Sequence, residues 1–176
     1  MSAPPDVMNK KLIDSEPSGA LAEGAEFEDE LLRDLRDIFE EKIVFNKLLG
    51  LKLTSVTATH VRASMAMRPE LVGNFSEGRL HGGVISAALD TTGGIAVTAA
   101  LCARYPHESF AQHALRFSRL GTIDLRIDYL RPGISEWFEL RAEVIRLGSR
   151  IANTRMEFFG SNGKLLATGN GVYIVS

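Results

Sequence analysis

Cysteine is nearly missing from this sequence: Cys102 is the single one among 176 residues. One thiol cannot close an internal disulfide, and it cannot supply a zinc site built from cysteines. Because structural disulfides mark oxidising compartments, this usage favours a protein that is kept in a reducing compartment.

An excess of charge and long hydrophobic runs are missing as well. The 20 Lys and Arg residues nearly balance the 22 Asp and Glu residues, which leaves a formal net charge of −2. A dedicated nucleic-acid binder usually carries a basic surplus, so we expect no nucleic-acid partner. The longest uncharged stretch, Thr91–Ala103, is too short for the roughly 20 apolar residues that cross a bilayer, and the first residues lack a signal-peptide pattern. We therefore expect a cytoplasmic protein without membrane insertion.

The signatures of several enzyme classes do not occur either. The sequence contains no HExxH, GxGxxG, GxxxxGKS/T or GxSxG pattern, so zincin, dinucleotide-binding, P-loop and nucleophile-elbow chemistry have no support. The remaining composition, 45% hydrophobic and 24% charged, is ordinary for a globular chain, and the length fits one domain.

Composition divides the chain into three parts. Residues 1–23 are rich in Pro, Ser, Gly and Ala and are typical of a flexible tail. Residues 24–50 predict a helical extension, with a short helix over 43–50 after a longer stripe of apolar residues at spacings of three and four: Phe27, Leu31, Leu32, Leu35, Ile38 and Phe39. We expect this extension to lie against the main domain, residues 51–176; a helix that binds another protein would show the same pattern.

The main domain has the pattern of an α+β fold. The segment His81–Arg104 is apolar nearly all round, which predicts a buried helix of about six turns. Residues 70–80 are predicted as a loop, and residues 105–120 as either a surface helix or a loop. Six antiparallel strands are predicted around the helix, at 51–59, 61–68, 122–130, 137–147, 151–159 and 165–175. In the strand over 122–130, alternation places Ile123, Leu125, Ile127 and Tyr129 on one face.

Asp90 is the strongest candidate for chemistry. It is the only charged residue from Gly82 to Ala103, inside the helix expected to be buried. Burying a carboxylate without a partner is costly, and a shielded carboxylate suits a general base or a nucleophile. The alternative is a structural aspartate that accepts a hydrogen bond from a nearby hydroxyl or backbone amide.

The second candidate is the start of that helix, His81–Gly82–Gly83. The first N–H groups of a helix have no internal partner and lie at the positive end of its dipole. Glycine allows another group to approach the backbone closely, so this end could hold a developing oxyanion. A glycine hinge that merely lets the helix begin is the alternative.

The spacing of the two candidates predicts a dimer. Asp90 follows Gly82 by eight residues, or roughly 12 Å along a helix at 1.5 Å per residue. One helix cannot place both groups on the same reacting atoms. An enzyme that uses both must combine two chains across a two-fold axis, which gives two equivalent sites.

Two glycines, Gly93 and Gly94, lie in the interior of the predicted helix, where each costs about 1 kcal/mol relative to alanine. Close approach of a partner helix or a ligand would explain them, as would helix packing alone.

His60, His107 and His113 form no recognisable motif with an acidic residue or with the cysteine, so we expect them at the surface or in loops.

Two segments resemble a known family. Val72–Gly94 contains Asn74, Gly78, His81–Gly82–Gly83 and Asp90 in the order of the hotdog-fold acyl-CoA thioesterases of the PaaI-like branch. The segment Gly121–Gly133, GTIDLRIDYLRPG, is similar to the strand that follows the helix in that family. The resemblance covers about residues 40–176.

The resemblance implies a hotdog fold, in which a curved antiparallel sheet wraps a long central helix, here with an extra N-terminal helix. It implies an acyl-CoA substrate and homodimers or dimers of dimers with active sites at the subunit interface. No metal and no separate cofactor is implied. A medium- or long-chain acyl group is the first expectation, with an aryl acyl-CoA substrate, or acyl-CoA binding without catalysis, as the alternatives.

The resemblance also assigns roles to residues. Asp90 would be the base or nucleophile, and the Gly82 amide of the other subunit would polarise the thioester carbonyl with His81 beside it. Thr122 would help to hold the attacking water. Asn74 would orient the same water, although it precedes His81 by seven residues where relatives have six. The CoA part would be bound by Arg150, Ser149 and Gly83.

Overall fold

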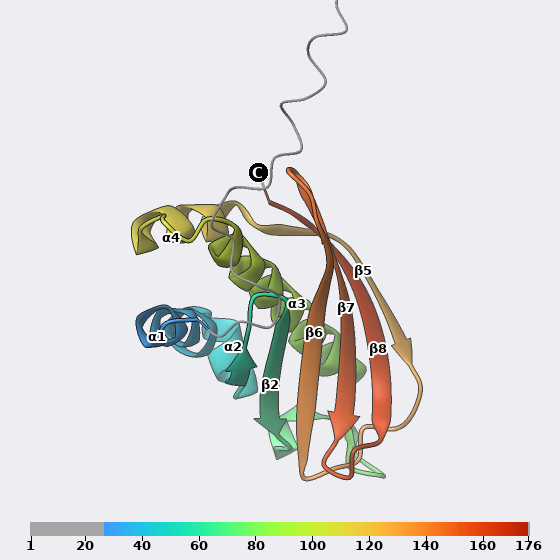
Figure 1. Cartoon of the computed structure of the whole chain (residues 1–176). Helices are drawn as coiled ribbons and strands as arrows, with labels where there is room; N and C mark the ends of the chain where they lie inside the picture. The colour runs from blue at the N-terminus through green and yellow to red at the C-terminus, as the bar shows by residue number, and fades with distance from the viewer. Residues whose placement is uncertain (1–26, 176) are drawn as a thin grey trace, which may run out of the picture.

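The computed structural model describes residues 27–175, so the predicted tail over 1–23 lies outside the described residues. A curved six-stranded antiparallel sheet packs around the long helix α3 (Gly82–Arg104), as Figure 1 shows. The strand order is β1-β2-β6-β7-β8-β5. The six strands are β1 (Lys52–Val56), β2 (His60–Ala66), β5 (Gly121–Tyr129), β6 (Trp137–Leu147), β7 (Ile151–Gly160) and β8 (Leu165–Ile174). The predicted α+β architecture is confirmed.

The N-terminal extension packs against this body at the β1–β2 side (Figure 1). It consists of α1 (Asp29–Asp37), a π-helical turn (Ile38–Lys42) and α2 (Val44–Leu49), which ends at Gly50 in a left-handed conformation with φ 72°. Leu35, Phe39 and Leu49 are buried in the main core. The structure therefore shows the first of the two alternatives for this segment, a helix that lies against the domain.

Two segments contain regular structure that the sequence analysis either left open or predicted wrongly. The predicted loop over 70–80 contains a short 3-10 turn (Pro69–Leu71) and a small hairpin of β3 (Val72–Asn74) and β4 (Arg79–Leu80). The ambiguous segment 105–120 contains helix α4 (Phe110–Arg119), which begins at a capping box made by Ser109 and Gln112. These elements flank the two ends of α3.

His113 on α4 corrects the expectation that the three unassigned histidines lie at the surface. Its side chain is buried, and its Nδ1 atom has no hydrogen-bond partner among the described residues. The Glu108 carboxylate lies 3.8 Å away, but burial dominates and lowers the pKa of His113 below its usual value. The sequence left segment 105–120 open between a surface helix and a loop, so it gave no indication that this side chain turns inward.

Helix α3 is the core of the domain. Every residue from Thr92 to Ala103 is buried against the strands. By length and composition α3 could cross a membrane, yet 72% of its most apolar window is buried inside the protein, as in the core helix of a globular domain. The prediction of a buried central helix is confirmed.

Gly93 leaves room for a side chain from the sheet. A Cβ atom at Gly93 would overlap the Tyr173 hydroxyl and lie 2.6 Å from Met156 Sδ. We therefore expect Gly93→Ala to lower the free energy of unfolding by about 1–3 kcal/mol, as overpacked cores do. Chemical denaturation of both purified proteins measures the difference.

Gly94→Ala is the matched control, because the nearest atom to its added Cβ is Leu120 Cδ2 at 3.5 Å, an ordinary contact. It should be neutral or stabilise the protein by up to about 1 kcal/mol through helix propensity. Equal destabilisation by the two substitutions would show that Gly93 is not the site of close packing.

Cys102 lies in the same helix and is buried, which raises the pKa of its thiol to about 12. We expect the folded protein to leave an aromatic disulfide reagent almost unreacted at neutral pH. Unfolding in guanidinium should then release one reactive thiol per chain. Rapid stoichiometric labelling of the folded protein would contradict the burial of this side chain.

Candidate active site

Asp90 is held by two hydroxyl groups from the sheet. The Thr122 hydroxyl donates to Asp90 Oδ1 at 2.9 Å, and the Tyr173 hydroxyl donates to the Asp90 backbone carbonyl at 2.9 Å. The Tyr173 oxygen also lies 3.4 Å from Asp90 Oδ1. Thr122 and Tyr173 are opposite each other in the β5–β8 pairing, so a single row of the sheet fixes the carboxylate. The Asp90 side chain is half-buried rather than enclosed.

A β-bulge aims Thr122 at Asp90. Thr122 pairs with Tyr173 and Asp124 with the next residue along, Val172, so Ile123 is the extra residue. Strict alternation would put Thr122 on the face opposite Leu125, away from α3. The bulge reverses that order: Leu125 packs on the core while Ile123 is exposed, which corrects the prediction that the two side chains share one face.

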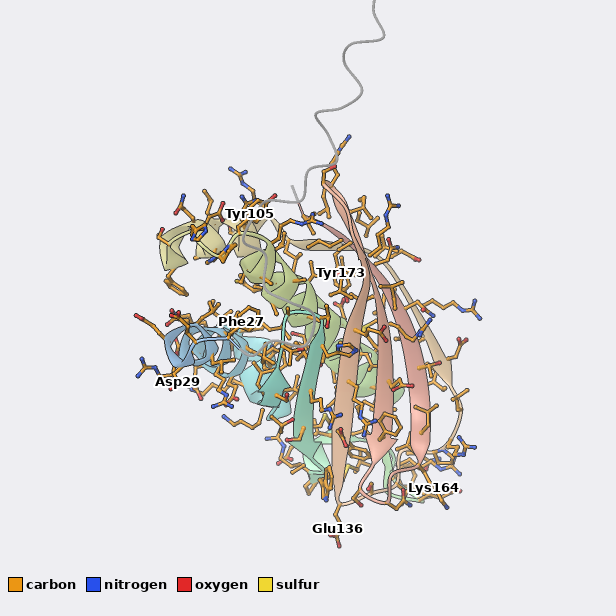
Figure 2. The ribbon with its side chains drawn as sticks, in the orientation of Figure 1. Phe27, Asp29, Tyr105, Glu136, Lys164 and Tyr173 are labelled. Atoms are coloured by element: carbon orange, nitrogen blue, oxygen red, sulfur yellow. The ribbon has the colours of Figure 1, made fainter. Side chains whose placement is uncertain are left out.

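Tyr173 contacts Asp90 and was missed by the sequence reasoning. Its side chain is buried between the sheet and α3, where Figure 2 labels it. Burial raises the pKa of this phenol, so the group stays protonated and can donate. The available signal was Gly93, whose missing side chain makes room for the Tyr173 ring. At Gly93 the close approach is made by packing within the chain, whereas Gly94 lines a cavity.

A cavity of about 280 Å³ opens beside the carboxylate, and we call it the Asp90 cavity. Its lining combines polar side chains, among them Asp90, Thr91 and Thr122, with apolar side chains. The complete lining is Ile43, Phe45, Asn46, Ala87, Asp90, Thr91, Gly94, Ile95, Phe117, Leu120, Gly121, Thr122 and Tyr173. The N-terminal extension thus forms one wall of this cavity.

His81 caps the start of α3. Its Nδ1 atom accepts from the Gly83 N–H at 2.9 Å, and its carbonyl accepts from Val84 at 3.0 Å and Ile85 at 3.3 Å. His81 therefore accepts from three of the first four N–H groups of the helix. The N–H of Gly82, the first residue of the helix, has no acceptor in the part of the chain that the structure describes.

A second cavity, of about 340 Å³, lies at this end of the helix, and we call it the Gly82 cavity. The Tyr129 hydroxyl donates to the Gly82 carbonyl at 3.0 Å, and the Ser86 hydroxyl donates to the same carbonyl at 3.1 Å. Sequence reasoning missed both residues. The lining is Arg79, Leu80, Gly82, Ile85, Tyr129, Leu130, Arg131, Pro132 and Gly133.

The two cavities share no residue. Gly82 and Asp90 lie eight residues apart on α3, roughly 12 Å along its axis, so one chain does not bring them together. This is the separation that the spacing predicted. Strand β5, which contributes to both cavities, lies at the end of the sheet, and its side chains Ile123 and Tyr129 are exposed.

The remaining predicted residues lie apart from Asp90. Asn74 is exposed in the β3–β4 hairpin at the Gly82 end, and its Oδ1 accepts from the N–H and the hydroxyl of Ser76 at 3.1 and 2.6 Å. Gly73 packs beside His81, so this hairpin belongs to the helix start. Within one chain Asn74 makes no contact with the carboxylate that it was predicted to serve.

Ser149 and Arg150 are exposed in the β6–β7 turn. The Arg104 guanidinium at the end of α3 holds this turn, because it donates to the carbonyls of Leu147 at 2.7 Å and Gly148 at 3.1 Å. Ile151 and Gly121 both pair with Ile174, which places the turn at the same end of the sheet as Thr122. Gly83, also predicted to bind CoA, already uses its N–H in the cap.

The sequence and the fold match known proteins. A family model described as the thioesterase superfamily matches residues 77–167. The medium/long-chain acyl-CoA thioesterase YigI of Escherichia coli K12 is 34% identical over 149 residues, which cover 84% of this chain and 95% of that protein. The crystal structure of a Shewanella oneidensis protein related to the thioesterase superfamily has a TM-score of 0.79 at 37% identity, over 84% of this chain and 96% of that chain.

The chain therefore belongs to the thioesterase superfamily and has its hotdog fold, with a long helix packed on a curved antiparallel sheet. It is a thioester hydrolase similar to YigI over nearly the whole length of that protein. The predicted family and fold are confirmed.

Proposed function

We propose that this protein hydrolyses medium- or long-chain acyl-CoA to a free acid and CoA, at sites shared between two copies of the chain. The observation that carries the proposal is the division of one helix into two half-sites. The Asp90 carboxylate, which accepts from Thr122, lines the Asp90 cavity. Gly82, whose N–H has no acceptor among the described residues, lines the Gly82 cavity.

In the proposed site the thioester carbonyl lies against the Gly82 N–H of one chain and faces Asp90 of the other. The N–H at the positive end of the helix dipole stabilises the negative charge that develops on the carbonyl oxygen. Asp90 acts as the base towards a water or as the nucleophile itself, and Thr122 orients its carboxylate. The protein groups need no metal and no cofactor beyond the substrate.

The proposed assembly is a homodimer, alone or paired into a dimer of dimers. The outer edge of β5 has no neighbouring strand in the described chain, and unpaired sheet edges readily accept another strand. Pairing of two β5 edges would bury Ile123 and Tyr129 and make the sheet continuous. It would also set the Gly82 cavity of one chain near the Asp90 cavity of its partner, where Asn74 of the chain that supplies Gly82 would lie near the water.

The CoA part is proposed to lie along arginine side chains. Arg150 and Ser149 project from the turn at the Thr122 end, while Arg79 and Arg131 line the Gly82 cavity. Guanidinium groups match phosphate geometry well. Gly83 would permit close approach of the CoA chain rather than donate, because its N–H is bonded to His81. A cytoplasmic location agrees with this substrate and stays a prediction.

A thiol-release assay tests the proposed function. We expect turnover across a panel from acetyl- to palmitoyl-CoA to be highest for medium or long chains, because apolar side chains such as Phe45 and Phe117 line the Asp90 cavity and YigI acts on such substrates. Preference for phenylacetyl- or benzoyl-CoA would move the substrate class to aryl thioesters. Tight acyl-CoA binding with no thiol release would contradict the proposal and favour a binding protein.

A further inference from the structure

Three threonines of α3 use their hydroxyl groups differently. Thr92 donates to the Ala88 carbonyl at 2.7 Å, and Thr98 donates to the Gly94 carbonyl at 3.0 Å. This is the usual bond of a threonine within a helix. Thr91 accepts a hydrogen bond instead, from Asn46 Nδ2 at 2.9 Å, and no acceptor for its own proton occurs among the described residues.

Asn46 fixes the direction of that hydroxyl. The side chain is fully buried on α2, and its other N–H donates to the Phe39 carbonyl at 3.0 Å. Both amide protons are therefore used, and turning the amide over would set its oxygen against that carbonyl oxygen. Since Asn46 can only donate to Thr91, the Thr91 proton must point elsewhere.

The buried Asn46 side chain also lowers the stability of the fold. Its Oδ1 atom is buried and has no hydrogen-bond partner in the described part of the chain. An unpaired buried acceptor costs stability, and an apolar side chain of the same size would avoid that cost. An unpaired buried acceptor calls for a physical explanation, and the bond from Asn46 Nδ2 to Thr91 offers one.

Thr91 and Asp90 line the same cavity with Thr122. We propose that Thr91 is a further catalytic residue, whose hydroxyl donates to the water that attacks the acyl carbon, and that Asn46 is the positioning residue that keeps it available. The inference rests on the proposed function and adds a residue pair to it. It makes α2, which precedes the segment matched by the family model, part of the catalytic unit.

The chemical step balances without a further reactant. The water oxygen forms a bond to the carbonyl carbon while Asp90 accepts a proton from the water. The C–S bond then breaks, and that proton passes to the CoA sulfur. If Asp90 attacks first, its oxygen bonds to the carbonyl carbon, the C–S bond breaks and CoA leaves as the thiolate. The water then hydrolyses the anhydride, which releases the acid and restores the Asp90 carboxylate, and the proton lost by the water goes to the CoA thiolate. In both routes Thr91 keeps its proton and donates a hydrogen bond that places one lone pair of the water towards the carbon.

Substitution of Thr91 is the first test. Thr91→Val keeps the shape and removes the hydroxyl, and we expect kcat to fall about tenfold with KM little changed, as for loss of one positioning hydrogen bond. Thr91→Ser should retain most of kcat. Thr92→Val is the matched control, because its hydroxyl is bonded within the helix and lies outside the cavity; it should turn over like the wild type.

A double-mutant cycle tests the positioning role of Asn46. Asn46→Leu should lower kcat by a similar factor, since Thr91 can then donate to its own helix. In the Thr91→Val background Asn46→Leu should have no further effect on kcat. If Asn46→Leu does not fold, Asn46→Ser replaces it in the same cycle, with thermal melting to confirm the folded state.

The outcomes separate this inference from the proposed function. Unchanged kcat in Thr91→Val, or a change in KM alone, overturns the role of Thr91 even if Asp90→Asn is inactive. Losses of kcat that multiply in the double mutant overturn the role of Asn46. Absence of turnover in the wild type itself overturns the proposed function, and this inference with it.

Discussion

Asp90→Asn is expected to lower kcat for acyl-CoA hydrolysis by about a thousandfold, the largest single effect in the molecule. Asparagine has the size of aspartate and retains an oxygen that can accept from the Thr122 hydroxyl, so the fold should persist. What is lost is the negative charge that accepts a proton or attacks the carbonyl carbon. Release of CoA thiol from the best substrate of the panel measures the effect.

Asp29→Asn is the matched control for this experiment, since Asp29 is exposed on α1 (labelled in Figure 2) and remote from both cavities. It should retain full activity. Thermal melting should be similar for wild type and both variants. Turnover by Asp90→Asn close to that of the wild type would remove Asp90 from the mechanism.

Removal of one backbone proton at Gly82 is expected to have the second largest effect. Gly82 is the first residue of α3, a position that tolerates proline, and His81 already has the extended conformation that a residue before proline prefers, with φ −66° and ψ 134°. Gly82→Pro should therefore delete the N–H without breaking the helix. We expect kcat to fall by about a hundredfold or more, as for loss of an oxyanion donor.

Gly82→Ala separates the lost proton from the added bulk. Its Cβ would lie 3.4 Å from the Tyr129 ring, at the limit of ordinary contact, and the N–H remains. Activity of the alanine variant within a few-fold of the wild type, with the proline variant inactive and folded, would assign the effect to the donor. Similar losses in both variants would assign it to crowding in the Gly82 cavity.

Mixed oligomers of these two variants test whether the site is shared. In a dimer of one Asp90→Asn chain and one Gly82→Pro chain, one site carries both defects and the other carries neither. Co-expression with two different affinity tags isolates this hybrid, which should regain about half of the wild-type activity per dimer. A hybrid as inactive as its two parents would show that each chain completes its own site.

The helical core and the Gly82 half-site follow from local patterns. A stretch that is apolar nearly all round can only be buried, so α3 was predictable, and a histidine before two glycines marked its start. The distance between Gly82 and Asp90 follows from the helical rise alone. The chemistry of Asp90 was indicated by its isolation as the one charge in an apolar helix.

Other features could not be predicted from local sequence patterns. The π-helical turn over Ile38–Lys42 and the place of Asn46 depend on how the extension packs against α3. The side chain of Tyr173 reaches Asp90 across 83 positions of sequence, through the opening left by Gly93. The periodicity of the local sequence does not predict which side chain fills such a gap, because that side chain comes from a distant strand.

The sequence by itself determined the class of fold, the buried helix, the two candidate positions on it and their separation, since each depends on the order of nearby residues. The tertiary structure decided what surrounds those positions. The bulge at Ile123 turns Thr122 towards Asp90, and the β5–β8 register sets Tyr173 beside it. Packing of α2 commits the Asn46 amide to Thr91. These contacts join residues far apart in the chain, so they exist only once the sheet has closed around the helix.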